Sequence, residues 1–159
     1  MTYWFMDTSA LAKRYLPENG SRWVKSLIAA NENEIHISEI TFPEIIAAIA
    51  GNSRAPQGIS ERLRDRMWTL FLDDCKIRYQ VLGVSRELID FSVELARRRK
   101  IRGCDAIQLA SALFVNKKLH DQELALTLVA ADGDMLVAAK LEGLETMNPK
   151  EIAKVENDS

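Results

Sequence analysis

The sequence contains no apolar run that approaches the roughly 18 to 20 residues needed to span a membrane. Its N-terminus also lacks a basic flank leading into a cleavable apolar segment, so we expect a cytoplasmic protein with no membrane partner. Cysteine and histidine are scarce, at two each in 159 residues. Cys75 and Cys104 form no CxxC or Cys/His pair, which argues against a zinc site and a disulfide framework. His36 and His120 have no motif around them, and we interpret both as structural or exposed.

An excess of positive charge is also absent. The 21 Lys and Arg residues are outnumbered by 23 Asp and Glu, giving a net charge of -2. This excludes a protein held on nucleic acid by its overall charge, so any such contact must be a local basic patch. Hydrophobic residues at 47% and charged residues at 28% are typical of globular proteins. The length fits one domain, which we expect over residues 1–149, followed by a polar tail over 150–159 that is expected to fray.

Strand and helix patterns alternate along the chain without an internal repeat or a linker. Apolar runs predict strands at 3–7, 34–37, 80–84, 125–131 and 144–147. Helical spacing predicts helices at 9–16, 21–30, 41–50 (starting as early as 38), 59–71, 85–99, 105–115 and 135–141, with a loop over 51–58. This alternation predicts an α/β fold, a three-layer sandwich in which helices flank a central, mainly parallel β-sheet.

Asp7 directly follows the first apolar run, Tyr3-Trp-Phe-Met6, and precedes Thr8 and Ser9. In a parallel sheet, reactive groups gather just past the carboxyl ends of the strands. The alternative role for Asp7 is a simple turn or capping residue. Thr8 or Ser9 could cap the helix that follows.

Three further acids occupy corresponding positions. Glu44 follows the second strand, within a Thr41-Phe-Pro-Glu44 sequence that also fits a capping box. Asp105 opens a helix, where it could simply complement the helix dipole. Asp132 ends a strand before Gly133, where a turn would account for it. Each structural role is plausible alone, but none explains why all four acids lie at strand–helix junctions.

Carboxylates gathered at one edge repel one another and stay ionised only when cations compensate them. Oxygen ligands without His or Cys suit Mg²⁺ or Mn²⁺ better than zinc. The residues alone therefore predict a site for a hard divalent cation.

Four segments of the chain resemble the PIN domain, and most closely the toxins of VapBC-type toxin-antitoxin systems. They are Asp7-Thr-Ser-Ala-Leu11, Ile37-Ser-Glu-Ile-Thr41 with Glu44, Gly103-Cys-Asp-Ala-Ile-Gln-Leu-Ala-Ser-Ala112, and Val129-Ala-Ala-Asp132. The resemblance implies a metal-dependent endoribonuclease with the acidic quartet Asp7, Glu44, Asp105 and Asp132, an RNA substrate and a cognate antitoxin. It departs at Ala130, where the family often has Ser or Thr.

The expected roles combine this resemblance with metal chemistry. Asp7, Asp105 and Asp132 would bind the metal directly or through water, and Glu44 would orient or deprotonate the attacking water. Thr8 and Ser9 would support the carboxylates or the scissile phosphate. Asp134 is a further acid whose alternative role is a surface helix cap.

One dense basic cluster precedes Asp105. Arg97, Arg98 and Arg102 in it are candidates for RNA binding, and its alternative role is to complement a helix C-terminus. The predicted helix over 59–71 has an apolar face that we expect to bury partly against a partner, either a second copy in a homodimer or the antitoxin. Packing inside the monomer is the alternative.

Other functions stay open at this stage. They are a PIN nuclease outside any toxin-antitoxin pair, a non-catalytic metal- or RNA-binding module, and a phosphoaspartyl enzyme or receiver. The last is disfavoured because a second aspartate would be expected at the position of Ser9.

Overall fold

A five-stranded sheet lies at the centre of the protein, whose computed structural model describes residues 1–157. The strands are β1 (Thr2–Met6), β2 (Asn33–Ser38), β3 (Tyr79–Leu82), β4 (Leu126–Val129) and β5 (Glu145–Met147). They lie in the order β3-β2-β1-β4-β5, and every pairing is parallel. The strand order reverses between β1 and β4, where the chains that leave the two strands diverge to form a crevice.

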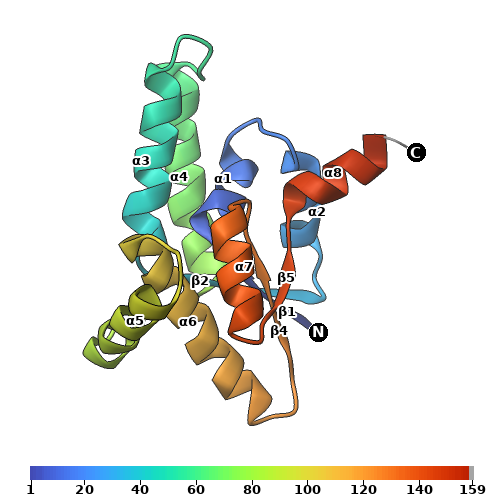
Figure 1. Cartoon of the computed structure of the whole chain (residues 1–159). Helices are drawn as coiled ribbons and strands as arrows, with labels where there is room; N and C mark the ends of the chain where they lie inside the picture. Colours follow the sequence, from blue (N-terminus) through green and yellow to red (C-terminus); the bar gives the residue numbers. More distant parts are fainter. Residues whose placement is uncertain (158–159) are drawn as a thin grey trace.

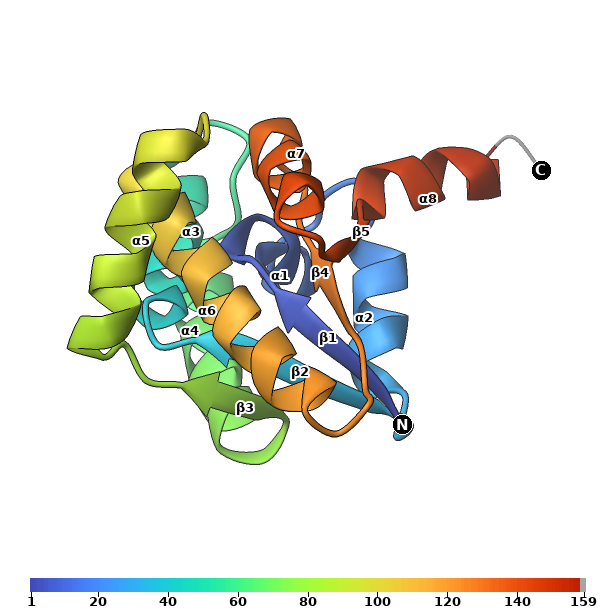
Figure 2. The ribbon, with the colours of Figure 1, turned by 60° about the horizontal axis from the view of Figure 1, so that its bottom comes forward.

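Helices cover both faces of this sheet (Figure 1, Figure 2). On one face lie α5 (Arg86–Arg98), α6 (Gly103–His120) and α7 (Gly133–Leu141), which pack against Phe5 and Leu128. The other face carries α1 (Thr8–Tyr15), α2 (Ser21–Ala29), α3 (Thr41–Arg54) and α4 (Glu61–Ile77), which pack around Met6 and Val129. Consecutive strand residues point to opposite faces, so β1 and β4 each feed both cores. The predicted three-layer α/β sandwich is confirmed. None of the described helices has both the length and the apolar character of a membrane span.

Several helix ends differ from their predicted positions. The helix predicted to stop at Gly51 continues to Arg54. A glycine that ends a helix usually adopts a positive φ, as Gly143 does after α7, whereas Gly51 does not. The following helix was predicted over 59–71, and instead α4 extends to Ile77 and packs along α3 (Figure 1). Polar residues on an exposed turn can continue a helix, but such a turn has no apolar periodicity from which its helical structure could be predicted.

The expectation that the chain frays after Pro149 was wrong for residues 149–157, which form helix α8 (Pro149–Asn157). Asn148 Oδ1 accepts a hydrogen bond from the Lys150 backbone N–H at 3.0 Å, which stabilises the first turn. Ala153 is buried, and α8 packs against α2. The remaining tail residues, 158 and 159, lie outside the described part of the chain.

Candidate active site

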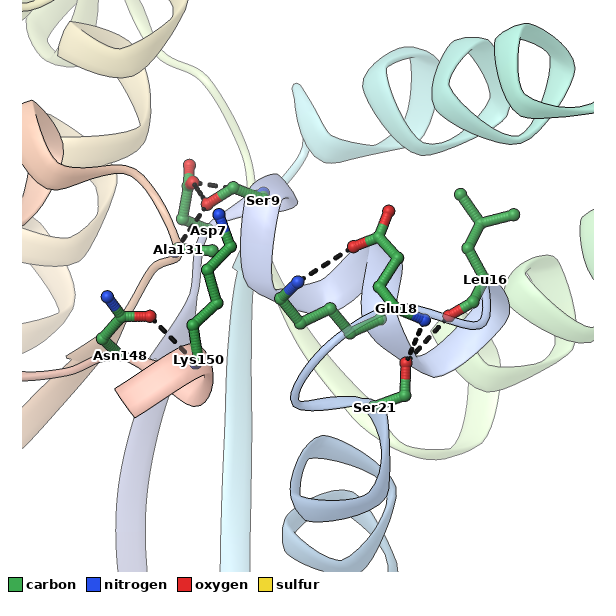
Figure 3. A network of polar contacts seen from close by, with 9 residues as sticks. Asp7, Ser9, Leu16, Glu18, Ser21, Ala131, Asn148 and Lys150 are labelled. Carbon is green, nitrogen blue, oxygen red and sulfur yellow. Dashed lines mark hydrogen bonds and ion pairs between the residues drawn. The ribbon is translucent and has the colours of Figure 1, made fainter. Parts of the chain in front are cut away.

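Asp7 lies at the carboxyl end of β1, and its carboxylate is almost fully buried. The N-cap of α1 is Asp7 itself rather than Thr8 or Ser9, because Asp7 Oδ2 accepts from the Ser9 backbone N–H at 3.2 Å. Ser9 Oγ donates to the same oxygen at 2.5 Å and accepts from the Ala131 N–H at 2.9 Å (Figure 3). Ser9 therefore ties the chain after β1 to the chain after β4.

The electrostatic environment of Asp7 is unfavourable to its charge. Burial raises its pKa from an ordinary 3.8 to about 6, although its hydrogen bonds to Ser9 act in the opposite direction. The negative charges of Asp105 and Glu44 are smaller contributions to the same rise. A side chain whose only role was to cap α1 would not need to face two other carboxylates.

Asp105 and Asp132 complete the carboxylate cluster from the α6–α7 side. Asp132 is the N-cap of α7, where its Oδ1 accepts from the Met135 N–H at 2.9 Å. Asp105 lies in the first turn of α6 and is half-buried. Burial is the main cause of its raised pKa, followed by the charges of Asp132 and Glu44, while Arg102 lowers it. The electrostatic influence thus extends over all four acids, although Asp105 follows helix α5 and not a strand, which differs from the predicted strand–helix junction.

Glu44 does not serve as part of a capping box. The N-cap of α3 is Ile40, which makes no side-chain capping bond. Glu44 Oε1 instead accepts from Thr8 Oγ1 at 2.9 Å and from Gln108 Nε2 at 2.8 Å. The sequence Thr-Phe-Pro-Glu imitates a capping box, but here the Glu44 side chain is directed to the end of β1.

Gln108 is a site residue that the sequence analysis missed. It is fully buried on α6, and its Nε2 also lies 3.0 Å from the Oγ1 atoms of both Thr8 and Thr41. Its Oε1 has no hydrogen-bond partner in the described part of the chain. The amide is held this way round because the reversed orientation would place its carbonyl oxygen against the Glu44 carboxylate. A useful signal was available: Gln108 follows Asp105 by three residues, so the two share a helix face.

The donor set suits a hard cation, although the described residues hold no group of three His, Cys, Asp or Glu side chains arranged as a metal site. The neighbouring carboxylates contribute to the raised pKa values of Asp7 and Asp105, so a divalent cation would relieve this repulsion. All of the donors are oxygens, which fits Mg²⁺ or Mn²⁺. The structure therefore brings oxygen donors of a suitable kind to one edge of the sheet.

A family model for the PIN domain matches residues 4–141 of the chain. The chain belongs to the PIN domain family. A search of the curated proteins finds no match.

Solved structures share this PIN fold. FitAB bound to an IR36 DNA fragment is 18% identical, with a TM-score of 0.63 over 92% of this chain and 95% of that one. VapBC2 from Rickettsia felis, bound to a DNA fragment from their promoter, is 15% identical, with a TM-score of 0.59 over 92% of this chain and 98% of that one. VapC20 from Mycobacterium tuberculosis, described as a toxin that cleaves the sarcin-ricin loop, is 20% identical, with a TM-score of 0.58 over 89% and 95%. At these identities, the likeness shows the fold alone.

The basic cluster of this PIN domain is largely paired with acids. Arg97 contacts Glu94 at 2.9 Å, while Arg98 and Arg99 both bind Glu142, at 2.8 and 2.7 Å. Lys100 lies 3.8 Å from Asp134, an exposed residue near the start of α7.

Arg102 differs from these neighbours because it forms no ion pair with the described residues. Together with Arg99, Lys100, Asp105 and Asp132 it lines a hollow of about 290 Å³. Of the three arginines predicted to bind RNA, Arg102 is the one next to the carboxylates. The histidines lie apart from the cluster: His36 is on β2, 2.8 Å from Glu34, and His120 ends α6.

Proposed function

We propose that this PIN domain is a metal-dependent endoribonuclease that hydrolyses RNA phosphodiester bonds, and that it is the toxin of a type II toxin-antitoxin pair. The observation that carries the proposal is the mutual electrostatic influence of Asp7, Glu44, Asp105 and Asp132. Membership of the PIN family supports it. Asp7 and Asp105 have raised pKa values, and such acids gathered in a crevice are typical of a functional site.

Asp7, Asp105 and Asp132 are the proposed ligands of Mg²⁺ or Mn²⁺, held directly or through water. When bound, such an ion neutralises charge on the phosphoryl group, lowers the pKa of a bound water and stabilises the leaving oxygen. Asp7 and Asp132 are held by the hydrogen bonds that cap α1 and α7, so their carboxylates are oriented before any ligand arrives.

Glu44 is the proposed residue that orients or deprotonates the attacking water. Thr8 and Gln108 both bind Oε1 of Glu44, and no hydrogen bond from the described residues reaches Oε2. The engaged oxygen fixes the carboxylate, while the other oxygen can accept a hydrogen bond from water. Proton transfer of this kind contributes about 10²–10⁴-fold to a rate.

Cleavage of total RNA by the purified protein tests the enzymatic part. With Mn²⁺ we expect cleavage that EDTA abolishes and that Asp105→Asn and Glu44→Gln each reduce by at least about 100-fold. Asp90→Asn is the matched control, because Asp90 is an exposed acid that pairs with Arg86 on α5. Cleavage that continues in EDTA, or that both Asp105→Asn and Glu44→Gln retain, would exclude the proposed chemistry.

The proposed protein partner is a cognate antitoxin. The similar FitAB and VapBC2 structures are bound to DNA fragments, and a similar structure from Klebsiella pneumoniae is a toxin-antitoxin complex. A small DNA-binding protein encoded next to this chain, once purified, should bind it and suppress cleavage. Undiminished cleavage in the presence of a saturating amount of that protein would remove the toxin assignment and leave a nuclease.

A homodimer is also proposed. The apolar side of α4 packs inside the chain through Phe71 and Met67, so the part of the helix left for a partner is small. Leu70 and Leu72 are 36% and 43% exposed on this helix. Leu72→Asp should shift the sedimentation of a dimer toward the monomer, and a wild-type monomer would contradict the proposal. The cytoplasmic location expected from the sequence stays a prediction.

A further inference from the structure

The carboxylate cluster is flanked by two hollows that share Asp132 as a wall. The first is the hollow lined by Arg102 and Asp105. The second has a volume of about 390 Å³ and is lined by Thr8, Ser9, Lys13, Asp132 and Lys150, among other residues. A chain lying across the acids would therefore enter both hollows.

Lys150 brings an unpaired positive charge to the second hollow. Its side chain runs from the first turn of α8 toward Asp7 and Ser9 (Figure 3). Within the described residues, no hydrogen bond or ion pair engages its ammonium group. Lys13, the other lysine of this hollow, is buried and bound to Glu18 at 2.9 Å. Lys150 is thus the lysine of this hollow that remains able to bind a ligand.

The backbone that carries Lys150 is held in place. Gly20, with a φ of 91°, approaches Pro149 so closely that a Cβ at position 20 would lie 2.8 Å from Pro149 Cβ. Asn148 binds the Lys150 N–H, and α8 packs on α2. Three separate contacts therefore fix the start of α8, so the origin of the lysine side chain is fixed beside the acids.

A phosphate group suits this hollow because its oxygens can accept from the Lys150 ammonium. The Thr8 and Ser9 hydroxyls line the same hollow, but they donate their protons to Glu44 and Asp7, so the phosphate would be held through Lys150. A flanking phosphate here would also explain how an acidic protein holds a polyanion: its charge is met by Lys150 on one side of the carboxylates and by Arg102 on the other.

We propose that Lys150 binds the RNA phosphate adjacent to the scissile one, on the side of the carboxylate cluster opposite Arg102. The proposal rests on the proposed ribonuclease function and adds the path of the strand: from the Arg102 hollow, across Asp132, to the Lys150 hollow. Lys150 binds substrate in this role and takes no part in bond cleavage.

The first test measures affinity for a fluorescent single-stranded RNA that spans the mapped cleavage site, by anisotropy over a series of salt concentrations in EDTA. Lys150→Gln should weaken binding and lower the slope of log affinity against log salt by about 0.7, the value for one phosphate contact on a single strand. Lys150→Arg should restore both. Lys154→Gln is the matched control, since Lys154 is an exposed lysine one turn further along α8. It should behave as wild type.

The second test identifies the phosphate. A neutral methylphosphonate replaces one linkage at a time on either side of the cleavage site. Wild type should lose affinity at both positions, whereas Lys150→Gln should be insensitive to one of them and Arg102→Gln to the other. Equal sensitivity of wild type and Lys150→Gln at both linkages would overturn the proposal.

The principal alternative is that Lys150 only neutralises the acids. In that case Lys150→Gln would tighten Mn²⁺ binding in calorimetry and leave the RNA salt slope unchanged, and this result also overturns the proposal. Failure of the proposed function looks different, because wild type itself would then neither bind nor cleave RNA. A wild type that cleaves RNA while Lys150→Gln keeps its slope removes only the Lys150 assignment.

Discussion

Replacing Asp7 by asparagine should make the metal-free protein more stable at neutral pH. The pKa of Asp7 rises from 3.8 to about 6, mainly because the carboxylate is buried. A tenfold change in an ionisation constant corresponds to about 1.4 kcal/mol, so keeping Asp7 ionised costs the fold about 3 kcal/mol. Asparagine has nearly the same shape and carries no charge.

The hydrogen bonds of Asp7 explain why asparagine should fit. Both bonds from Ser9 go to the same oxygen, Oδ2. An asparagine side chain at this position can place its single oxygen there, and its uncharged amide group removes the repulsion from Asp105 and Glu44. Asparagine is also as effective an N-cap as aspartate.

The difference in stability between Asp7→Asn and wild type should change with pH in a direction that can be checked. The folded-state pKa of Asp7 lies above the unfolded value, so the fold favours the protonated acid. Below about pH 4 Asp7 is protonated in both states, and the two proteins should differ little. The free-energy cost of ionising the buried Asp7 in wild type grows as the pH rises from about 4 to 6, and it reaches its full value above that range.

Thermal and urea unfolding in EDTA at pH 4.5 and 7.5 measure this difference. At pH 7.5, Asp7→Asn should unfold about 6–12 °C above wild type, since about 2–4 °C corresponds to 1 kcal/mol for a chain of this size. Excess Mn²⁺ should stabilise wild type and not the variant. A variant that is less stable than wild type by the same amount at both pH values would refute the reasoning, because Asp7 would then act only as a cap.

Three further predictions can be tested. Two concern residues outside the quartet, and the third concerns the proposed cation. Gln108→Leu should lower kcat about 10–100-fold by releasing Glu44, with KM nearly unchanged, whereas Ser111→Ala, a buried change one turn along α6, should leave kcat as in wild type. An equal loss in both would make Gln108 a packing residue. Asp74→Ala should destabilise the fold by about 3–5 kcal/mol in urea unfolding, because it leaves the cation of Arg14, 2.6 Å away, without its buried partner; a loss below about 1 kcal/mol would contradict this. Mn²⁺ calorimetry should show binding to wild type that Asp105→Asn weakens strongly, and equal binding would argue against a shared site.

The sheet and the positions of the acids could be predicted because both depend on local patterns. Apolar runs followed by polar turns indicate where strands end, and in parallel strands those ends meet at one edge. Asp7 and Asp132 follow adjacent strands that pair Met6 with Val129. Predicting that these two acids lie close together therefore required only the order of the strands in addition to the sequence.

Helix ends and long-range polar contacts were harder to predict. Gly51 would normally be taken as a helix end, but α3 continues through it, with α4 packed alongside. Glu44 fits a capping box in the sequence, whereas its partners Thr8 and Gln108 are 36 and 64 positions away. Which of two local interpretations holds depends on residues that only the folded chain brings together.

The sequence shows how many basic and acidic residues the protein has, but not which of the basic residues face the acidic cluster. The densest run of arginines is largely balanced, because Glu142 binds both Arg98 and Arg99 from 44 and 43 positions away. Lys150, by contrast, stands in a tail that looked merely polar, and the fold brings it to the acids from the opposite side. An acidic protein could therefore present two cations to a phosphate backbone although Arg97, Arg98 and Arg99 of its densest basic run are paired with acids. The number of charges that face the ligand determines electrostatic affinity, and that number is set by ion pairs formed on folding, so the net charge of the chain could not supply it.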